Sequence, residues 1–127
     1  MPSLRKRALP PSLHLRQATL RDLSVLVEHR AGMWKDLERM DPDVLRKGSR
    51  FYRNWLRERM SDGTMVGYLV EEKGGRTIAS GLVMLRERDP PPGGGTSMIP
   101  HIISMFTEKN YRGKGIGTAM VNALLDW

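Results

Sequence analysis

The sequence contains no cysteine, and this absence excludes several kinds of site. Without thiols the chain has no disulfide framework, no thiolate nucleophile and no cysteine-ligated zinc. The composition fits a reducing compartment, so we expect a cytoplasmic protein. The sequence also lacks the HxxH, HExxH and Gly-x-Ser-x-Gly patterns and any cluster of carboxylates. We therefore expect neither a metal site nor a serine hydrolase.

Long apolar segments are missing as well. No apolar run approaches the ~20 residues of a membrane-spanning helix. The basic N-terminal segment MPSLRKRALPPS has no apolar core of the kind found in secretory signals. We therefore expect no membrane partner. What remains, 39% hydrophobic and 28% charged residues over 127 positions, is the composition of a single globular domain.

Positive charge is present in excess, with a formal net charge of +7. An anionic partner such as nucleic acid, a membrane surface or a phosphorylated cofactor would account for it. An arginine-rich solvated surface would account for it equally. The arginines are spread along the chain, and only Arg112 and Lys114 stand in a context suited to phosphate. We favour a mixture of the two interpretations.

Hydrophobic periodicity predicts alternating helices and strands with no internal repeat. Thr19 and Asp41 are each a good N-cap for a helix. The predicted order begins with a strand at 13–19, a helix from Thr19 to about Arg39, and a helix from Asp41 with a candidate break at Gly48-Ser49. It continues with a hairpin of strands at 64–73 and 76–88 around Gly74-Gly75, a loop at 89–95, a buried strand at 98–106 and a final helix. A hairpin followed by a strand and a helix predicts an α+β fold with a mixed sheet, not a purely parallel one.

The segment KNYRGKGIGTAM, residues 109–120, lies between the last predicted strand and the last helix. The first N–H groups of a helix point outward there, and the helix dipole is positive. Glycines let a phosphate approach the backbone, while Arg112 and Lys114 add positive charge. A glycine-rich turn with incidental basic residues is the plainer alternative. Because strand, glycines, cations and helix coincide, we predict a diphosphate site.

Two common phosphate-binding motifs do not fit this segment. A Walker A loop requires Ser or Thr after Gly-Lys, whereas Gly115 follows Lys114. A GxGxxG fingerprint requires a third glycine, but that position is Thr118 or Met120, depending on where the count begins. A different class of phosphate ligand is therefore expected.

The run from Arg112 to Gly117, RGKGIG, resembles the R-x-x-G-x-G acyl-CoA pyrophosphate signature of the GCN5-related N-acetyltransferase (GNAT) family. The preceding SMFTEKNYRGKG, the opening LRQATLRDLSVLVEHRAGMW and the hairpin GYLVEEKGGRTIASGLVML are also similar to that family, so the resemblance covers about Leu13 to Trp127. It implies an acyl-CoA N-acyltransferase-like α+β fold, with a mixed, mostly antiparallel sheet flanked by helices. It also implies transfer of an acetyl group from acetyl-CoA, the cosubstrate, to a primary amine.

The resemblance also implies which residues hold the cosubstrate. In the family, pantetheine hydrogen-bonds the backbone of the fourth strand, as an added strand would. Those backbone groups here belong to Met105, Phe106 and Thr107. The amides of the turn would hold the pyrophosphate, and they belong to Arg112, Gly113, Lys114, Gly115, Ile116, Gly117 and Thr118.

Catalysis requires a route for the amine's proton and stabilisation of the oxyanion. His101, in the fourth strand a few residues before the pantetheine segment, is the candidate general base. A histidine that merely fills space in a strand is an equal alternative. Glu28, the second catalytic candidate, and His29 lie in the first helix, a region that often lines the acceptor site in the family. The amide of Phe106 or Thr107 would polarise the thioester carbonyl.

The family continues with a fifth strand, a fourth helix and usually a final hairpin, whereas this sequence stops in the third helix. We therefore expect residues 1–12 to be a disordered basic leader and residues 13–127 to be a truncated GNAT-like domain without the C-terminal strands. An edge exposed in this way leads us to expect a homodimer or domain exchange. A non-catalytic acyl-CoA-binding fragment is one alternative function.

A basic nucleic-acid-binding module is the other alternative, suggested by the arginines of the second predicted helix. The sequence has no aromatic RNP motif, KH loop or zinc pattern to support it, so nucleic acid is not the favoured partner. The acceptor amine, whether of a small molecule or a peptide, cannot be read from the sequence.

Overall fold

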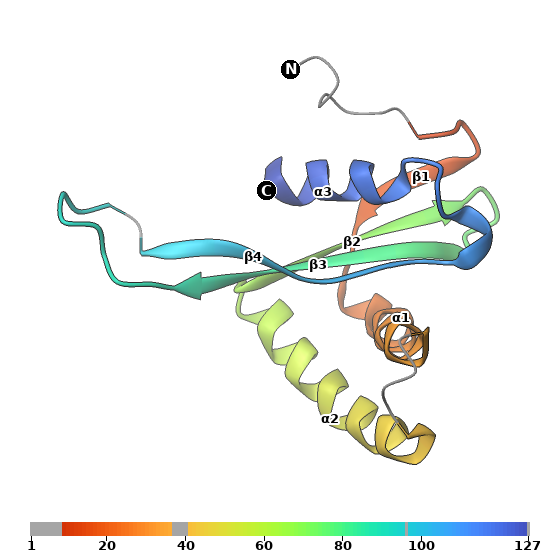
Figure 1. Cartoon of the computed structure of the whole chain (residues 1–127), viewed down its shortest axis with the longest axis horizontal. Coiled ribbons are helices and arrows are strands. Elements are labelled where there is room, and N and C mark those ends of the chain that lie inside the picture. The colour runs from red at the N-terminus through yellow and green to blue at the C-terminus, as the bar shows by residue number, and fades with distance from the viewer. Residues whose placement is uncertain (1–8, 37–40, 96, 127) are drawn as a thin grey trace.

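The computed structural model describes residues 9–36, 41–95 and 97–126 (Figure 1). Its elements are β1 (Leu13–Gln17), a 3₁₀ turn (Leu20–Asp22), α1 (Leu23–Asp36), α2 (Pro42–Ser61), β2 (Met65–Glu72), β3 (Thr77–Glu87), β4 (Met98–Thr107), a second 3₁₀ turn (Lys109–Tyr111) and α3 (Ile116–Asp126). The predicted order of elements is confirmed.

The four strands form one sheet in the order β1-β2-β3-β4, and each neighbouring pair is antiparallel. Figure 1 shows α3 on one face of this sheet and α1 with α2 on the other. The α+β prediction, with a mostly antiparallel sheet flanked by helices, is confirmed. β4 is the outermost strand of the described sheet, so its second edge faces no described strand.

Buried apolar side chains fill both faces of the sheet. Leu69 and Leu82 pack against α1 and α2 through Leu26 and Leu56. On the opposite face, strand residues meet α3, and the buried members there are Val66, Val70, Ile78, Ala79, Val83, Ile116, Met120 and Leu124. This double burial explains why β2 and β3 read as nearly continuous apolar runs.

Capping residues precede both helices on the face of the sheet that carries α1 and α2. Thr19 and Asp22 form a capping box at the first 3₁₀ turn, which leads directly into α1. Arg16 bonds Asp22 at 2.8 Å and Glu71 at 2.5 Å, which joins β1, β2 and this turn. Asp41 caps α2 by accepting from the Asp43 N–H at 2.8 Å. These caps confirm the two predicted helix starts.

Three expectations about segments differ from the structure or lie outside it. The candidate break at Gly48-Ser49 is wrong, because α2 is continuous and Ser49 Oγ donates to the Leu45 carbonyl at 2.8 Å. The end of the first helix near Arg39 and residues 1–8 of the leader lie outside the described residues. Residues 9–12 form a turn before β1, in which the Leu13 N–H donates to the Pro10 carbonyl at 2.9 Å.

The prediction that the whole of β4 is buried is wrong. Residues 98–102 are exposed, and only the second half of the strand is half-buried. Figure 1 shows the cause, because the first half of β4 and the end of β3 project together beyond α3. A bulge separates the halves: Leu82 pairs with Ser104 and Val83 with Ile102, which leaves Ile103 as an extra residue.

Candidate active site

The glycine segment lies where it is predicted, between the end of β4 and the start of α3. Gly113 and Gly115 both have φ of +79°, in the left-handed region that favours glycine. The chain therefore reverses over a few residues and enters α3 at Ile116. This geometry explains why the segment alternates glycine with other residues.

Open space borders this turn. A Cβ atom built at Gly113 or Gly117 would meet no other group within 4 Å. The first intrahelical bond of α3 runs from the Ala119 N–H to the Gly115 carbonyl at 3.1 Å. The N–H groups of residues 116–118 therefore have no intrahelical acceptor and are available to donate hydrogen bonds to an anion.

Both cations of the motif stay beside the turn. Arg112 Nε donates to the Thr107 carbonyl at 2.7 Å, and its guanidinium carbon lies 5.8 Å from the centre of the Phe106 ring. Lys114 Nζ lies 5.4 Å from the centre of the Tyr111 ring. Arg112 thus joins the turn to the end of β4 as well as adding charge.

The predicted pantetheine segment, Met105 to Thr107, pairs with β3 along one edge. Met105 packs toward α3, and its Sδ occupies the space above Gly81, where a Cβ atom would lie only 2.7 Å away. The other edge of this segment faces no strand in the described part of the chain. Its backbone groups there are placed to bind an extended ligand as a further strand would be bound.

Glu28 and His29 have opposite environments on α1. Glu28 is exposed, whereas His29 is 8% exposed, with Nδ1 2.7 Å from Ser80 Oγ and its ring 4.7 Å from the Phe106 ring, centre to centre. Burial lowers the pKa of His29 from 6.5 to about 4, so the ring is neutral at neutral pH. The pair supports β4 from beneath the pantetheine segment. The sequence signal for this buried pair is Ser80, a polar residue inside an otherwise apolar strand.

His101 lies on the exposed half of β4, opposite Met84 on β3. The bulge at Ile103 separates it from Phe106. No contact between His101 and Glu28, or between either residue and the 112–118 turn, is found among the described residues. Their catalytic roles remain predictions. The described residues also include no group of three histidine or acidic side chains placed to hold a metal ion.

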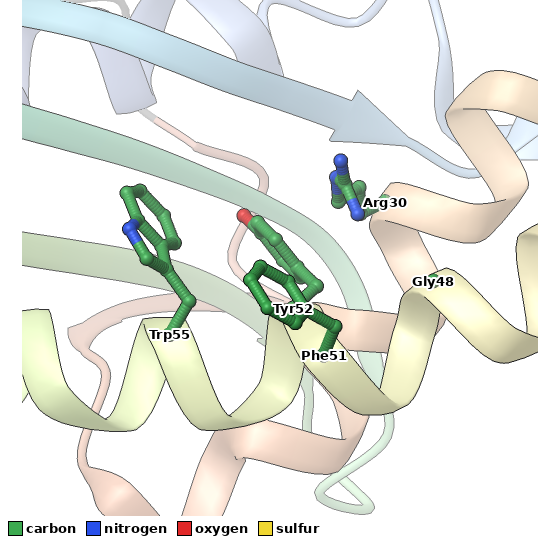
Figure 2. A pocket seen from close by; sticks show the side chains of 5 residues that line it. All are labelled: Arg30, Gly48, Phe51, Tyr52 and Trp55. Carbon is green, nitrogen blue, oxygen red and sulfur yellow. The ribbon is translucent and has the colours of Figure 1, made fainter.

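A groove of about 370 Å³ lies between α1 and α2 (Figure 2). Figure 2 shows one lining side chain from α1 and the others from α2, and the lining residues are Arg30, Gly48, Phe51, Tyr52 and Trp55. The guanidinium carbon of Arg30 is 3.8 Å from the centre of the Tyr52 ring. The Tyr52 and Trp55 rings stack with their centres 5.7 Å apart. Periodicity within one helix does not predict this groove, because its lining comes from two different helices.

Comparison with known proteins identifies the family. The model of the acetyltransferase (GNAT) family matches residues 26–127. A GCN5-related N-acetyltransferase from Ralstonia eutropha has a similar structure, with a TM-score of 0.78 and 27% identity over 90% of this chain and 74% of that one. A predicted acetyltransferase from Clostridium acetobutylicum, solved with acetyl-CoA, gives 0.74 and 25% over 90% and 71%.

A third similar structure is an aminoglycoside 6′-N-acetyltransferase from Acinetobacter baumannii, with a TM-score of 0.66 and 19% identity over 91% of this chain and 70% of that one. At this identity the likeness concerns the fold alone. No curated protein sequence matched this chain. No helix in the described ranges is long and apolar enough to cross a membrane. The chain belongs to the acetyltransferase (GNAT) family and is an acetyl-CoA-dependent N-acetyltransferase.

Proposed function

We propose that the chain holds the pyrophosphate of acetyl-CoA on the amides of residues 112–118 and the pantetheine along the outer edge of residues 105–107. The acetyl group is then transferred to the primary amine of a small molecule or peptide. The observation that carries this proposal is the open glycine turn at the start of α3, directly after an edge of β4 that faces no described strand. An anion and an extended chain find complementary groups side by side there.

The relatives support the same ligand. The Clostridium acetobutylicum protein was solved with acetyl-CoA, and its identity of 25% spans most of this chain. The aminoglycoside 6′-N-acetyltransferase shares the fold only, so it does not favour an aminoglycoside as the acceptor here.

In the proposed reaction, the neutral amine attacks the thioester carbonyl carbon. A C–N bond forms, the C–S bond breaks, and the proton lost by the amine balances the one gained by the CoA thiolate. His101 is our proposed general base and Glu28 the second candidate. The amide of Phe106 or Thr107 would donate to the carbonyl oxygen as negative charge develops on it.

We also propose a cytoplasmic location and self-association. The lack of cysteine supports a reducing compartment. The apolar side chains exposed on β4, including Ile99 and Ile102, support a homodimer or domain exchange.

A thiol-release assay with acetyl-CoA and a panel of amines tests the proposed reaction. We expect release of CoA that depends on the amine and equals the amide formed, as measured by mass spectrometry. Failure of every amine to release CoA, together with no calorimetric signal for CoA binding, would contradict the proposal.

A further inference from the structure

The groove between α1 and α2 combines apolar walls with one charged side chain. Phe51, Tyr52 and Trp55 supply the aromatic surface, and among the described residues that line the groove Arg30 alone is charged. Its volume of about 370 Å³ is near the lower end of the range for small-molecule sites, ~300–1,000 Å³. The groove therefore suits a small acceptor better than a folded partner.

Arg30 is held in a way that leaves its hydrogen-bonding edge open. Its guanidinium lies over the face of the Tyr52 ring, which stabilises the cation without using its N–H groups. Among the described residues, no acceptor or carboxylate bonds the Arg30 side chain. A planar guanidinium with a free edge binds a carboxylate through two parallel hydrogen bonds.

Tyr52 adds a second donor at the same place. The residue is 8% exposed, and burial raises the pKa of its hydroxyl, so the group stays protonated. No described residue accepts a hydrogen bond from it. The Tyr52 ring lies under the Arg30 guanidinium and lines the same groove, so its hydroxyl adds a second donor to the groove.

The surrounding charge favours the same kind of ligand. Other basic residues lie along α2, at positions including Arg46, Lys47, Arg50 and Arg53, and the chain as a whole carries +7. This field attracts anions and repels polycations. Polyamines and other polycationic acceptors are therefore disfavoured.

We propose that the acceptor is an amino carboxylate with an aromatic or aliphatic side group, its carboxylate on Arg30 and its apolar part against Phe51 and Trp55. The proposal rests on the acetyl transfer proposed above. The acceptor nitrogen forms a C–N bond to the acetyl carbon as the C–S bond breaks. The products are an N-acetyl amino carboxylate and CoA thiol.

The test compares phenylalanine with phenethylamine, which differ only in the carboxylate. We expect wild type to favour phenylalanine in kcat/KM by about 10- to 100-fold, the range of a lost hydrogen-bonded charge. The variant Arg30→Gln should lower this ratio about as much as the carboxylate contact raises it, and leave the KM for acetyl-CoA unchanged. Because the two amines differ in intrinsic reactivity, the change of the ratio between wild type and variant is the readout.

Arg57→Gln is the matched control, because it removes the same charge from an exposed position on α2 outside the groove. It should keep the wild-type ratio. If Arg30→Gln leaves the ratio of phenylalanine to phenethylamine unchanged, or if spermidine is acetylated as fast as phenylalanine, the acceptor proposal fails while the acetyltransferase assignment stands. An equal fall of the ratio in both variants would also overturn it, since only general charge would then matter.

Binding of the products separates this inference from the activity itself. N-Acetylphenylalanine should quench tryptophan fluorescence, through Trp55 in the groove, and N-acetylphenethylamine should bind about 10-fold or more weakly. Arg30→Gln should abolish the difference even if no amine on the panel is turned over. Equal binding of the two compounds, or no binding, would contradict the inference. A change in molar mass with Arg30→Gln and an unchanged ratio would instead mark the groove as a contact between two copies.

Discussion

At the residue scale, the buried pair of His29 and Ser80 lies directly against the segment predicted to bind the cosubstrate. His29 joins α1 to β3 through Ser80 and contacts the ring of Phe106 on β4. Because the buried imidazole is neutral in the native state, its role there is to pack against Phe106 and to hydrogen-bond Ser80. We regard it as a positioning residue for β4.

The low pKa of His29 predicts a specific loss of stability in acid. The unfolded chain takes up the proton near the ordinary pKa of 6.5 and the folded chain only near 4, so this contribution is complete above 6.5 and is lost as pH falls toward 4. Between about pH 7.5 and about pH 5, wild type should lose ~2 kcal/mol of unfolding free energy more than His29→Gln. Urea unfolding of both proteins measures the difference. Parallel pH profiles would contradict the buried neutral state.

His101 carries the second residue-scale prediction. If it is the general base, His101→Ala should lower kcat by about 10²- to 10⁴-fold and alter the alkaline rise of the pH–rate profile. CoA affinity should hardly change, because the second half of β4 separates His101 from the 112–118 turn proposed for the pyrophosphate. Glu28→Gln is the companion variant. Equal rates for wild type and His101→Ala across the neutral range would return the role to Glu28 or to water.

At the element scale, caps and turns can be predicted from the sequence because they depend on local chemistry. Thr19, Asp41 and the 112–118 glycines act within a few residues of their own position. The continuity of α2 through Gly48 depends instead on tertiary packing, since Tyr52 and Leu56 bury its next turns against the sheet and outweigh a weak helix former.

Features formed by contacts between elements also depend on tertiary packing, so the sequence pattern does not predict them. The bulge at Ile103 and the exposure of residues 98–102 follow from how β3 and β4 project past α3. The Arg30–Tyr52 contact and the His29–Ser80 pair each join residues from different elements. The groove proposed for the acceptor and the support beneath β4 are therefore visible only in three dimensions, whereas the turn proposed for the cosubstrate can be predicted from the sequence.

The outer edge of β4 leads to a prediction about self-association. Exposed Ile99 and Ile102 lie on a strand whose second edge faces no described strand, a combination that favours pairing with another chain. We expect the molar mass measured by light scattering to rise with protein concentration, and Ile102→Lys to reduce this rise. Leu125→Lys, an exposed substitution on α3, is the control and should have less effect. A concentration-independent monomer for the wild type would contradict the prediction.

At the scale of the whole molecule, the net charge of +7 is not by itself evidence for nucleic acid. CoA and the acceptor carboxylate that we propose are both anions, and we propose separate sites for them at the α3 turn and at the α1–α2 groove. The same positive field would attract both ligands. The proposed cosubstrate site is local in sequence, whereas the proposed acceptor site is assembled from two helices.

The most direct measurement of the central claim is calorimetric titration of CoA and of pantetheine, which lacks the pyrophosphate, into wild type and Gly117→Val. A Cβ atom at Gly117 would have no group from outside its own helix within 4 Å, so the variant should fold and lose only the space for the phosphates. Gly48→Val on α2, also in open space, controls for the cost of valine in a helix. We predict that wild type and Gly48→Val bind CoA at least ~10-fold more tightly than pantetheine, and that Gly117→Val loses this preference. An unchanged preference for CoA in folded Gly117→Val would contradict the pyrophosphate site at the start of α3.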